Sequence, residues 1–229
     1  MNSVVLIVEA LAVIVALVLL GLALVAIATS LISRPSTVGS VQIGALHDST
    51  RSDPSGAVRS VQSADLELDS EALEAIWSPL YLERLARTYW RFLTRCTLGL
   101  IRVKYSDEER FVVFIGRPFV LLAFAKPEYE VTAERGVVRW RIERGVLVAA
   151  PGIDGDGYLE IGVARREGEH PGRSTLDVDV EIANYYPRIA LSIAQWAYAA
   201  TQSRIHVLVT YGFLRSLARG DLAPLRSDR

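Results

Sequence analysis

The chain has 229 residues, of which 25 are basic and 26 acidic, so its formal net charge is −1. This balance excludes a whole-chain electrostatic field that would attract nucleic acid, and we expect no nucleic-acid partner. The single cysteine excludes an internal disulfide framework.

The N-terminal segment is apolar. Residues Ala10–Ala28 form a run of nineteen apolar residues without a charge. At a rise of about 1.5 Å per residue, this run covers most of the roughly 30 Å hydrocarbon layer of a bilayer, and Leu31 and Ile32 extend it. The sequence therefore predicts a transmembrane anchor over residues 1–32, with the lipid bilayer as a partner.

The residues around this run indicate how the anchor is used. No Lys or Arg precedes the run, and it is longer than the apolar core of a signal peptide, so a retained anchor is favoured over cleavage after Ala26-Ile27-Ala28. Arg34, Arg51 and Arg59 follow the run, which favours a cytoplasmic location for the rest of the chain. The predicted localisation is the cell membrane, in a single-pass topology.

Residues 33–64 are rich in Ser, Thr, Gly, Pro and Asp. This composition predicts a flexible linker, with a short strand near Ala57–Val61 as an alternative for its end. Residues 65–229 are then long enough for a single α+β domain.

Two helices are predicted next. Asp69 or Ser70 can cap the first, and Ser78 with Pro79 fits the start of the second. The second has an apolar face, formed by Leu82, Leu85, Tyr89, Phe92 and Cys96, and an opposite basic face, formed by Arg84, Arg87, Arg91 and Arg95. We expect this arginine stripe either to contact anionic lipid headgroups or to form a solvated face that pairs with Glu83.

A long β region follows, in which short runs of alternating or apolar residues are separated by turn-forming residues. The predicted strands are Leu98–Tyr105, Arg110–Ile115, Phe119–Phe124, Glu128–Thr132, Val137–Glu143, Val146–Ala150, Tyr158–Arg165 and Thr175–Ala183. If the fifth and the last of these strands are neighbours, their polar faces pair arginines with carboxylates.

Pro187 opens a predicted C-terminal helix of about 30 residues, whose apolar stripe includes Trp196 and Tyr211. Residues 204–211 are rich in β-branched side chains, so a strand there is the alternative. Gly220 is suited to end the helix.

Motifs for catalysis, cofactors and metals are weak. The loop Asp154-Gly155-Asp156-Gly157 lacks the further ligands of a calcium loop. The histidines His47, His170 and His206 are scattered, and Cys96 is expected to be a buried hydrophobic residue. We therefore assign no catalytic, cofactor-binding or metal-binding residue.

The predicted order is an N-terminal transmembrane helix, helices, an antiparallel β meander of about seven to eight strands and a long C-terminal helix packed on the sheet. This α+β order resembles the helix-grip architecture of START-like and polyketide-cyclase-like proteins, without a shared residue motif. The resemblance implies an apolar ligand held between the sheet and the helix. Trp140, Tyr185, Trp196 and Tyr211 are the candidate pocket-lining residues.

Three functions remain open from the sequence. The favoured one is a membrane-tethered, non-enzymatic module that binds a lipid or another apolar small molecule. The alternatives are an interaction or assembly subunit of a membrane protein complex, with a membrane protein as partner, and an enzyme of unknown class.

Overall fold

The computed structural model describes residues 27, 34–106, 108–115, 120–153, 155–187 and 207–224. Within these residues, no helix combines the length and the apolar character that a membrane span requires. The predicted anchor over residues 1–32 lies outside the described residues, apart from Ile27.

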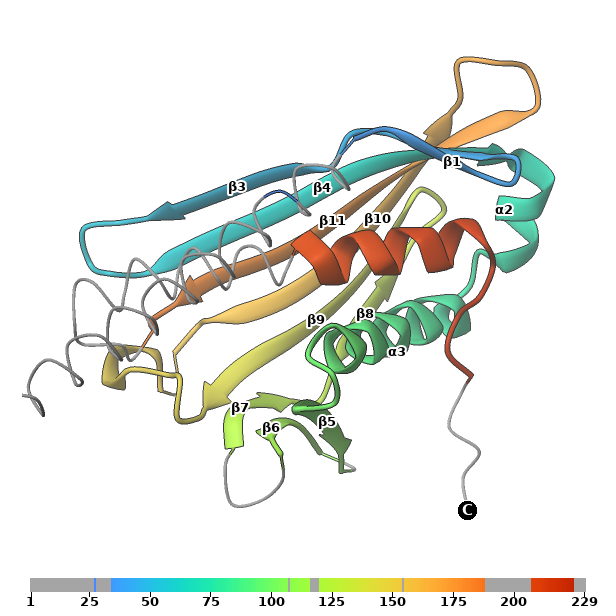
Figure 1. Ribbon diagram of the computed structural model, residues 1–229. Helices are drawn as coiled ribbons and strands as arrows, with labels where there is room; N and C mark the ends of the chain where they lie inside the picture. The colour runs from blue at the N-terminus through green and yellow to red at the C-terminus, as the bar shows by residue number, and fades with distance from the viewer. Residues whose placement is uncertain are drawn as a thin grey trace, which may run out of the picture.

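An antiparallel sheet of eleven strands makes up most of the described chain (Figure 1). Its main path has the order β1-β2-β4-β11-β10-β9-β7-β6-β5, while β3 pairs with β4 and β8 pairs with β9. The strands are β1 (Ser36–Val38), β2 (Val41–Ile43), β3 (His47–Ser52), β4 (Val58–Asp69), β5 (Ile101–Tyr105), β6 (Glu109–Phe114), β7 (Val120–Ala125), β8 (Glu128–Val131), β9 (Arg135–Arg144), β10 (Tyr158–Glu167) and β11 (Arg173–Tyr185). The α+β class is confirmed, but the predicted number of strands was too low.

The first four strands correct the predicted linker over residues 33–64. Val38, Val41 and Ile43 are buried in the core, although they are scattered among polar residues. All six residues of β3 are exposed, and β3 pairs only with β4 at the edge of the sheet. A polar edge strand carries no apolar alternation, which is why its composition looked like that of a linker.

The two predicted helices are confirmed with their caps. In α2 (Ser70–Ile76), the Asp69 side chain accepts hydrogen bonds from the backbone N–H groups of the first turn. In α3 (Pro79–Cys96), Ser78 Oγ accepts one from Tyr81 N at 3.2 Å. Cys96 at the end of α3 is exposed, which corrects its predicted burial.

The predicted strand Val146–Ala150 is not a strand of the sheet. Its first residues hydrogen-bond to the start of β7, Val148 forms an isolated bridge with Pro187, and a 3₁₀ turn occupies Ala150–Gly152. Gly145 has a φ of 154°, and Pro151 cannot donate a ladder hydrogen bond. These two residues interrupt the extended backbone on both sides.

Residues 207–218 form a helix, so the alternative of a strand is wrong for residues 207–211. Gly220 has a φ of 67° and follows the helix end as predicted. The predicted helical residues from Pro187 to position 206, including Trp196, lie outside the described residues apart from Pro187 itself. Figure 1 shows the helix of residues 207–218 beside α3, over the same face of the sheet.

Candidate functional site

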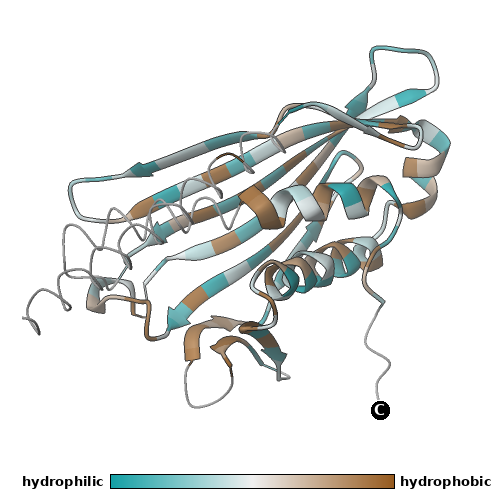
Figure 2. Cartoon of the chain, viewed as in Figure 1, coloured by the Kyte–Doolittle hydropathy of each residue, from teal (hydrophilic) through white to brown (hydrophobic). Residues whose placement is uncertain are grey.

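The sheet face under α3 and the helix of residues 207–218 is called the inner face here. Its central strands place alternate side chains in the core: Leu66, Val178, Val180, Ile161, Val138 and Trp140 are each at most 1% exposed. Figure 2 shows the corresponding alternation of hydrophobic and hydrophilic residues along the long strands. A wall of this kind can contact an apolar ligand through dispersion and hydrophobic burial.

A polar cluster interrupts this apolar face near the edge strand β3. The inner-facing positions of β4 change from Leu66 and Ala64 to Gln62 and Ser60, and Gln62 and Ser60 are only 1% and 6% exposed. Gln62 Nε2 donates to Asp48 Oδ1 at 2.8 Å and to Ser60 Oγ at 2.9 Å. Sequence reasoning missed the cluster because it assigned β3 and the start of β4 to a linker.

The four candidate pocket-lining residues have different positions. Trp140 and Tyr185 are buried in the core at 1% and 2% exposure, and Tyr185 Oη donates to Leu147 O at 2.8 Å. Tyr211 is half-buried and accepts a hydrogen bond from Arg215. Trp196 lies outside the described residues. The structure therefore places Trp140 and Tyr185 among packed core side chains, and it does not bring the four together as an open pocket among the described residues.

The arginine stripe of α3 is mostly engaged within the chain. Arg84 donates to the backbone carbonyl groups of Leu222 and Ala223, and Arg91 donates to Ser216 Oγ and to Asp221 O. These contacts join α3 to the C-terminal segment.

The other two arginines of the stripe differ from each other. Arg87 forms an ion pair with Glu83 at 2.8 Å, which was the alternative interpretation of the stripe. Arg95 is exposed, and its guanidinium lies 5.5 Å from the centre of the Phe92 ring. Only one of the four predicted lipid contacts thus remains exposed.

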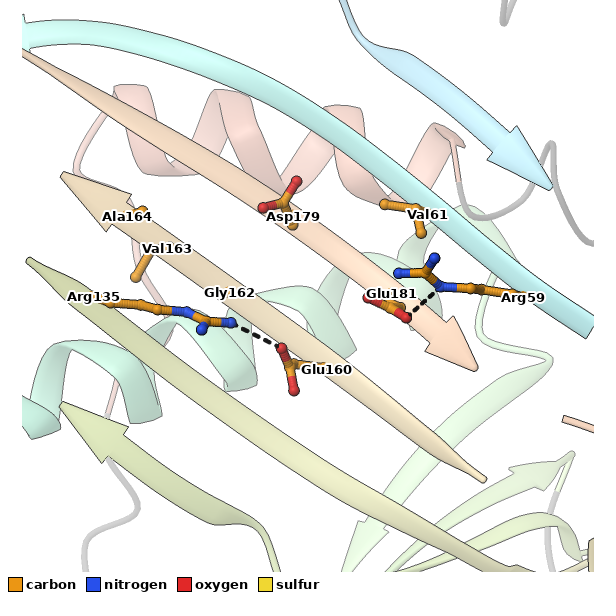
Figure 3. Close-up of a pocket in the computed structure, with 9 residues that line it drawn as sticks. All are labelled: Arg59, Val61, Arg135, Glu160, Gly162, Val163, Ala164, Asp179 and Glu181. Atoms are coloured by element: carbon orange, nitrogen blue, oxygen red, sulfur yellow. Dashed lines mark hydrogen bonds and ion pairs between the residues drawn. The ribbon is translucent and has the colours of Figure 1, made fainter. Parts of the chain in front are cut away.

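A polar hollow of about 240 Å³ lies on the opposite face of the sheet, called the outer face here (Figure 3). Glu160 and Glu181 are direct cross-strand partners there. Arg139 Nε donates to Glu160 Oε2 at 2.7 Å, and Arg59 Nε donates to Glu181 Oε1 at 2.8 Å. Each carboxylate is therefore neutralised by an arginine from the strand on its other side.

The pairing of two polar strand faces was expected only if the two strands were neighbours, and they are not. Strand β10 separates β9 from β11, so the arginines of β9 meet Glu160 of β10 instead of the carboxylates of β11. Because Glu160 interrupts an otherwise apolar run in β10, the sequence pattern did not identify it as the partner.

Asp179, which lines this hollow, allows the effect of the neighbouring carboxylates on stability to be tested. Asp179 is exposed, but partial desolvation by its surroundings raises its pKa, and the charges of Asp177 and Glu181 raise the pKa further. A carboxyl whose pKa is higher in the folded state costs stability when ionised, and this cost disappears below its unfolded pKa of about 3.9. We expect Asp179→Asn to raise the melting temperature at pH 7, with a gain that shrinks as the pH falls towards 4.

Asp177→Asn is the matched control, because Asp177 accepts two hydrogen bonds from Arg166 at 2.7 and 2.8 Å. This variant removes an ion pair and should give no gain at pH 7. Thermal melts at both pH values check the prediction, and a gain for Asp179→Asn that does not depend on pH would contradict it.

Within the described part of the chain, no three His, Cys, Asp or Glu side chains are grouped so that they could hold a metal ion. His170 Nδ1 lies 2.9 Å from Glu67 Oε1, and His47 is at the start of the exposed β3. His206 and Asp154 lie outside the described residues. Asp156 accepts a hydrogen bond from Asn184.

No protein-family model and no curated protein sequence matches the chain. Solved structures similar to it include a conserved protein of unknown function, EF2215, from Enterococcus faecalis, with 13% identity, a TM-score of 0.30 and coverage of 79% of this chain and 82% of that one. CalU16 from Micromonospora echinospora has 14% identity, a TM-score of 0.29 and coverage of 78% and 87%. Human STARD10 has 6% identity, a TM-score of 0.26 and coverage of 76% and 78%.

Proposed function

We propose that the chain is a membrane-tethered, non-enzymatic module that holds a lipid or another apolar small molecule between the inner face of its sheet and the helices over that face. The apolar segment Ala10–Ala28 would be the tether. Arg51 and Arg59 belong to strands of the folded domain, so the proposed cytoplasmic location of that domain rests on Arg34 alone.

The observation that carries the proposal is the polar cluster in the apolar inner face. Packing alone would favour apolar side chains at positions 60 and 62, as at positions 64, 66 and 68 of the same strand face. Binding sites for apolar molecules combine a largely hydrophobic lining with a few polar groups that fix the orientation of the ligand. Gln62 and Ser60 are suited to orient the polar end of such a ligand.

Different helices cover different parts of the inner face. Among the described elements, α3 packs against β5, β8 and β9, whereas α2 packs against β4 and β11 at the end opposite the polar cluster. The cluster therefore lies away from the strands and strand ends on which α2 and α3 pack.

The test compares two substitutions on opposite faces of adjacent strands. Ile182 is on the inner face, directly opposite Ser60, and Val61 is on the outer face, directly opposite Glu181. The full chain is purified in detergent, and the lipids and other apolar molecules that remain bound are identified by mass spectrometry. We expect one molecular class, enriched over the bulk membrane lipids, in the wild type and in Val61→Trp, but depleted in Ile182→Trp.

Two further measurements serve as controls for this comparison. Melting temperatures near that of the wild type show that both tryptophan variants are folded. Gln62→Leu keeps nearly the same volume and removes the amide, so it should retain the ligand more weakly than the wild type. Equal retention by the wild type and by all three variants would contradict the proposal.

A further inference from the structure

An apolar tip lies where α3 turns into β5 and where β6 ends. It is formed by Leu98, Leu100 and Ile115, whose exposed fractions are 91%, 48% and 63%. Ile115 N donates to Leu100 O at 2.7 Å, so these two residues continue the pairing of β5 with β6 and lie side by side. Figure 2 shows hydrophobic residues along the turn between α3 and β5. Clustered exposed apolar side chains of this kind mark contact surfaces.

The backbone of the tip is strained in a way that keeps these side chains exposed. After Thr97 at the C-cap of α3, Leu98 N bonds to Arg95 O and Gly99 N bonds to Thr94 O, which is the Schellman pattern. Leu98 occupies the left-handed position that is usually glycine in this motif, with a φ of 52°. Ile115 has a φ of 58°, which is rare for a β-branched residue. Burial does not offset this strain, because both side chains face solvent.

Basic side chains surround the tip. Arg102 and Lys104 are exposed and alternate with Leu100 along the same side of β5, and Arg95 is exposed in the last turn of α3. None of the ion pairs among the described residues includes these three side chains. Arg102 Nε donates to Gly99 O at 3.0 Å within the tip, and its side chain is still exposed. Arg84, Arg87 and Arg91, in contrast, are partly buried and are held by partners on α3 or the C-terminal segment.

We propose that the apolar tip inserts into the interface of an anionic lipid bilayer, with Arg95, Arg102 and Lys104 on the headgroups. A shallow apolar group beside exposed basic side chains that form no ion pair among the described residues complements a surface that is negatively charged outside and apolar beneath. The proposal uses the tether of the proposed function only to keep the domain near a bilayer.

The lone cysteine provides the probe. Cys96 is exposed and lies two residues before Leu98. Partial burial raises the pKa of its thiol, so labelling with a polarity-sensitive maleimide fluorophore is carried out at mildly alkaline pH. The labelled full chain is reconstituted into vesicles of phosphatidylcholine alone, or of phosphatidylcholine and phosphatidylglycerol in equal parts. Lipids that are brominated on their acyl chains quench the fluorescence of the label when the label reaches the hydrocarbon region of the membrane.

We expect strong quenching in the anionic vesicles at low salt, and weaker quenching in high salt or in phosphatidylcholine alone. Leu98→Gly removes the apolar side chain and relieves the strained φ, so it should reduce quenching several-fold without lowering the melting temperature. Arg102→Gln should reduce the docked fraction by up to about fivefold. Leu80→Ser, at an exposed leucine near the opposite end of α3, is the matched control and should quench like the wild type.

Equal quenching in the wild type and in Leu98→Gly would overturn the proposal, because the tether alone would then explain the proximity of Cys96 to the lipid. Protection of the label from aqueous iodide without quenching by brominated lipid would also overturn it, since a protein partner or a second copy would then cover the tip. The molecules bound to the Leu98→Gly chain are also identified by mass spectrometry. If this variant loses membrane docking but retains its bound molecule, the docking of the tip and the binding of the ligand are separate properties of the protein.

Discussion

Replacing Trp140 with alanine should destabilise the full chain by about 3–5 kcal/mol, because it removes a large side chain that is only 1% exposed. Trp140 of β9 contacts Trp90 of α3 edge to face, with ring centres 5.3 Å apart. Trp90 in turn lies 5.4 Å from Tyr89, and Tyr89 lies 6.2 Å from Phe213 of the C-terminal helix. This row of rings joins the sheet to both helices above it, so its loss should weaken the whole helical layer.

The measurement is the melting temperature of the full chain in detergent, which should fall by about 10 °C or more. Tyr129→Ala provides a control, because Tyr129 is 42% exposed and its truncation should have a much smaller effect. A similar melting temperature for Trp140→Ala and the wild type would mean that the helices do not pack on the sheet through this row of rings.

Replacing Gly212 with valine should destabilise the chain by up to about 3 kcal/mol, the upper part of the usual range for overpacking. A Cβ atom at Gly212 would lie 2.3 Å from Cδ1 of Phe92, so the C-terminal helix and α3 approach each other too closely for a side chain at this position. Helix propensity opposes this effect only weakly, because valine is a better helix former than glycine by less than about 1 kcal/mol.

A double-mutant cycle isolates the contact. Phe92→Ala makes room for the new side chain, so the double variant should be more stable than the sum of the two single effects predicts. Thermal melts of the four chains check this expectation. Strictly additive effects would show that the two helices do not meet at these residues.

The sequence predicts best those features that depend on local chemistry. Asp69 and Ser78 cap their helices as expected, because a short oxygen-bearing side chain before a helix satisfies its free N–H groups wherever the helix packs. The alternation of Leu176, Val178 and Val180 with acidic residues predicts a half-buried strand, and β11 is that strand. Each of these signals is contained within a few consecutive residues of the sequence.

The features that the sequence did not reveal depend on distant partners. Strand β3 consists of polar residues and becomes a strand through its pairing with β4. Arg84 and Arg91 look like a free basic surface until the C-terminal segment supplies their acceptors, more than a hundred residues later in the chain. Leu98 looked like the first residue of a strand, whereas the structure places it at the end of α3 in a position that glycine usually occupies. The first two outcomes are decided by tertiary contacts that no local pattern encodes. Leu98, in contrast, is placed by the local hydrogen bonds at the end of α3, without the glycine that normally marks this position.

The most direct test of the proposed function is native mass spectrometry of the full chain, in which the protein is released from detergent under gentle conditions so that non-covalently bound molecules stay attached. The polar cluster at Gln62 and Ser60 in an apolar wall predicts the mass of the polypeptide plus one small apolar molecule, and the loss of that added mass in Ile182→Trp but not in Val61→Trp. The bare polypeptide mass for the wild type would contradict the account.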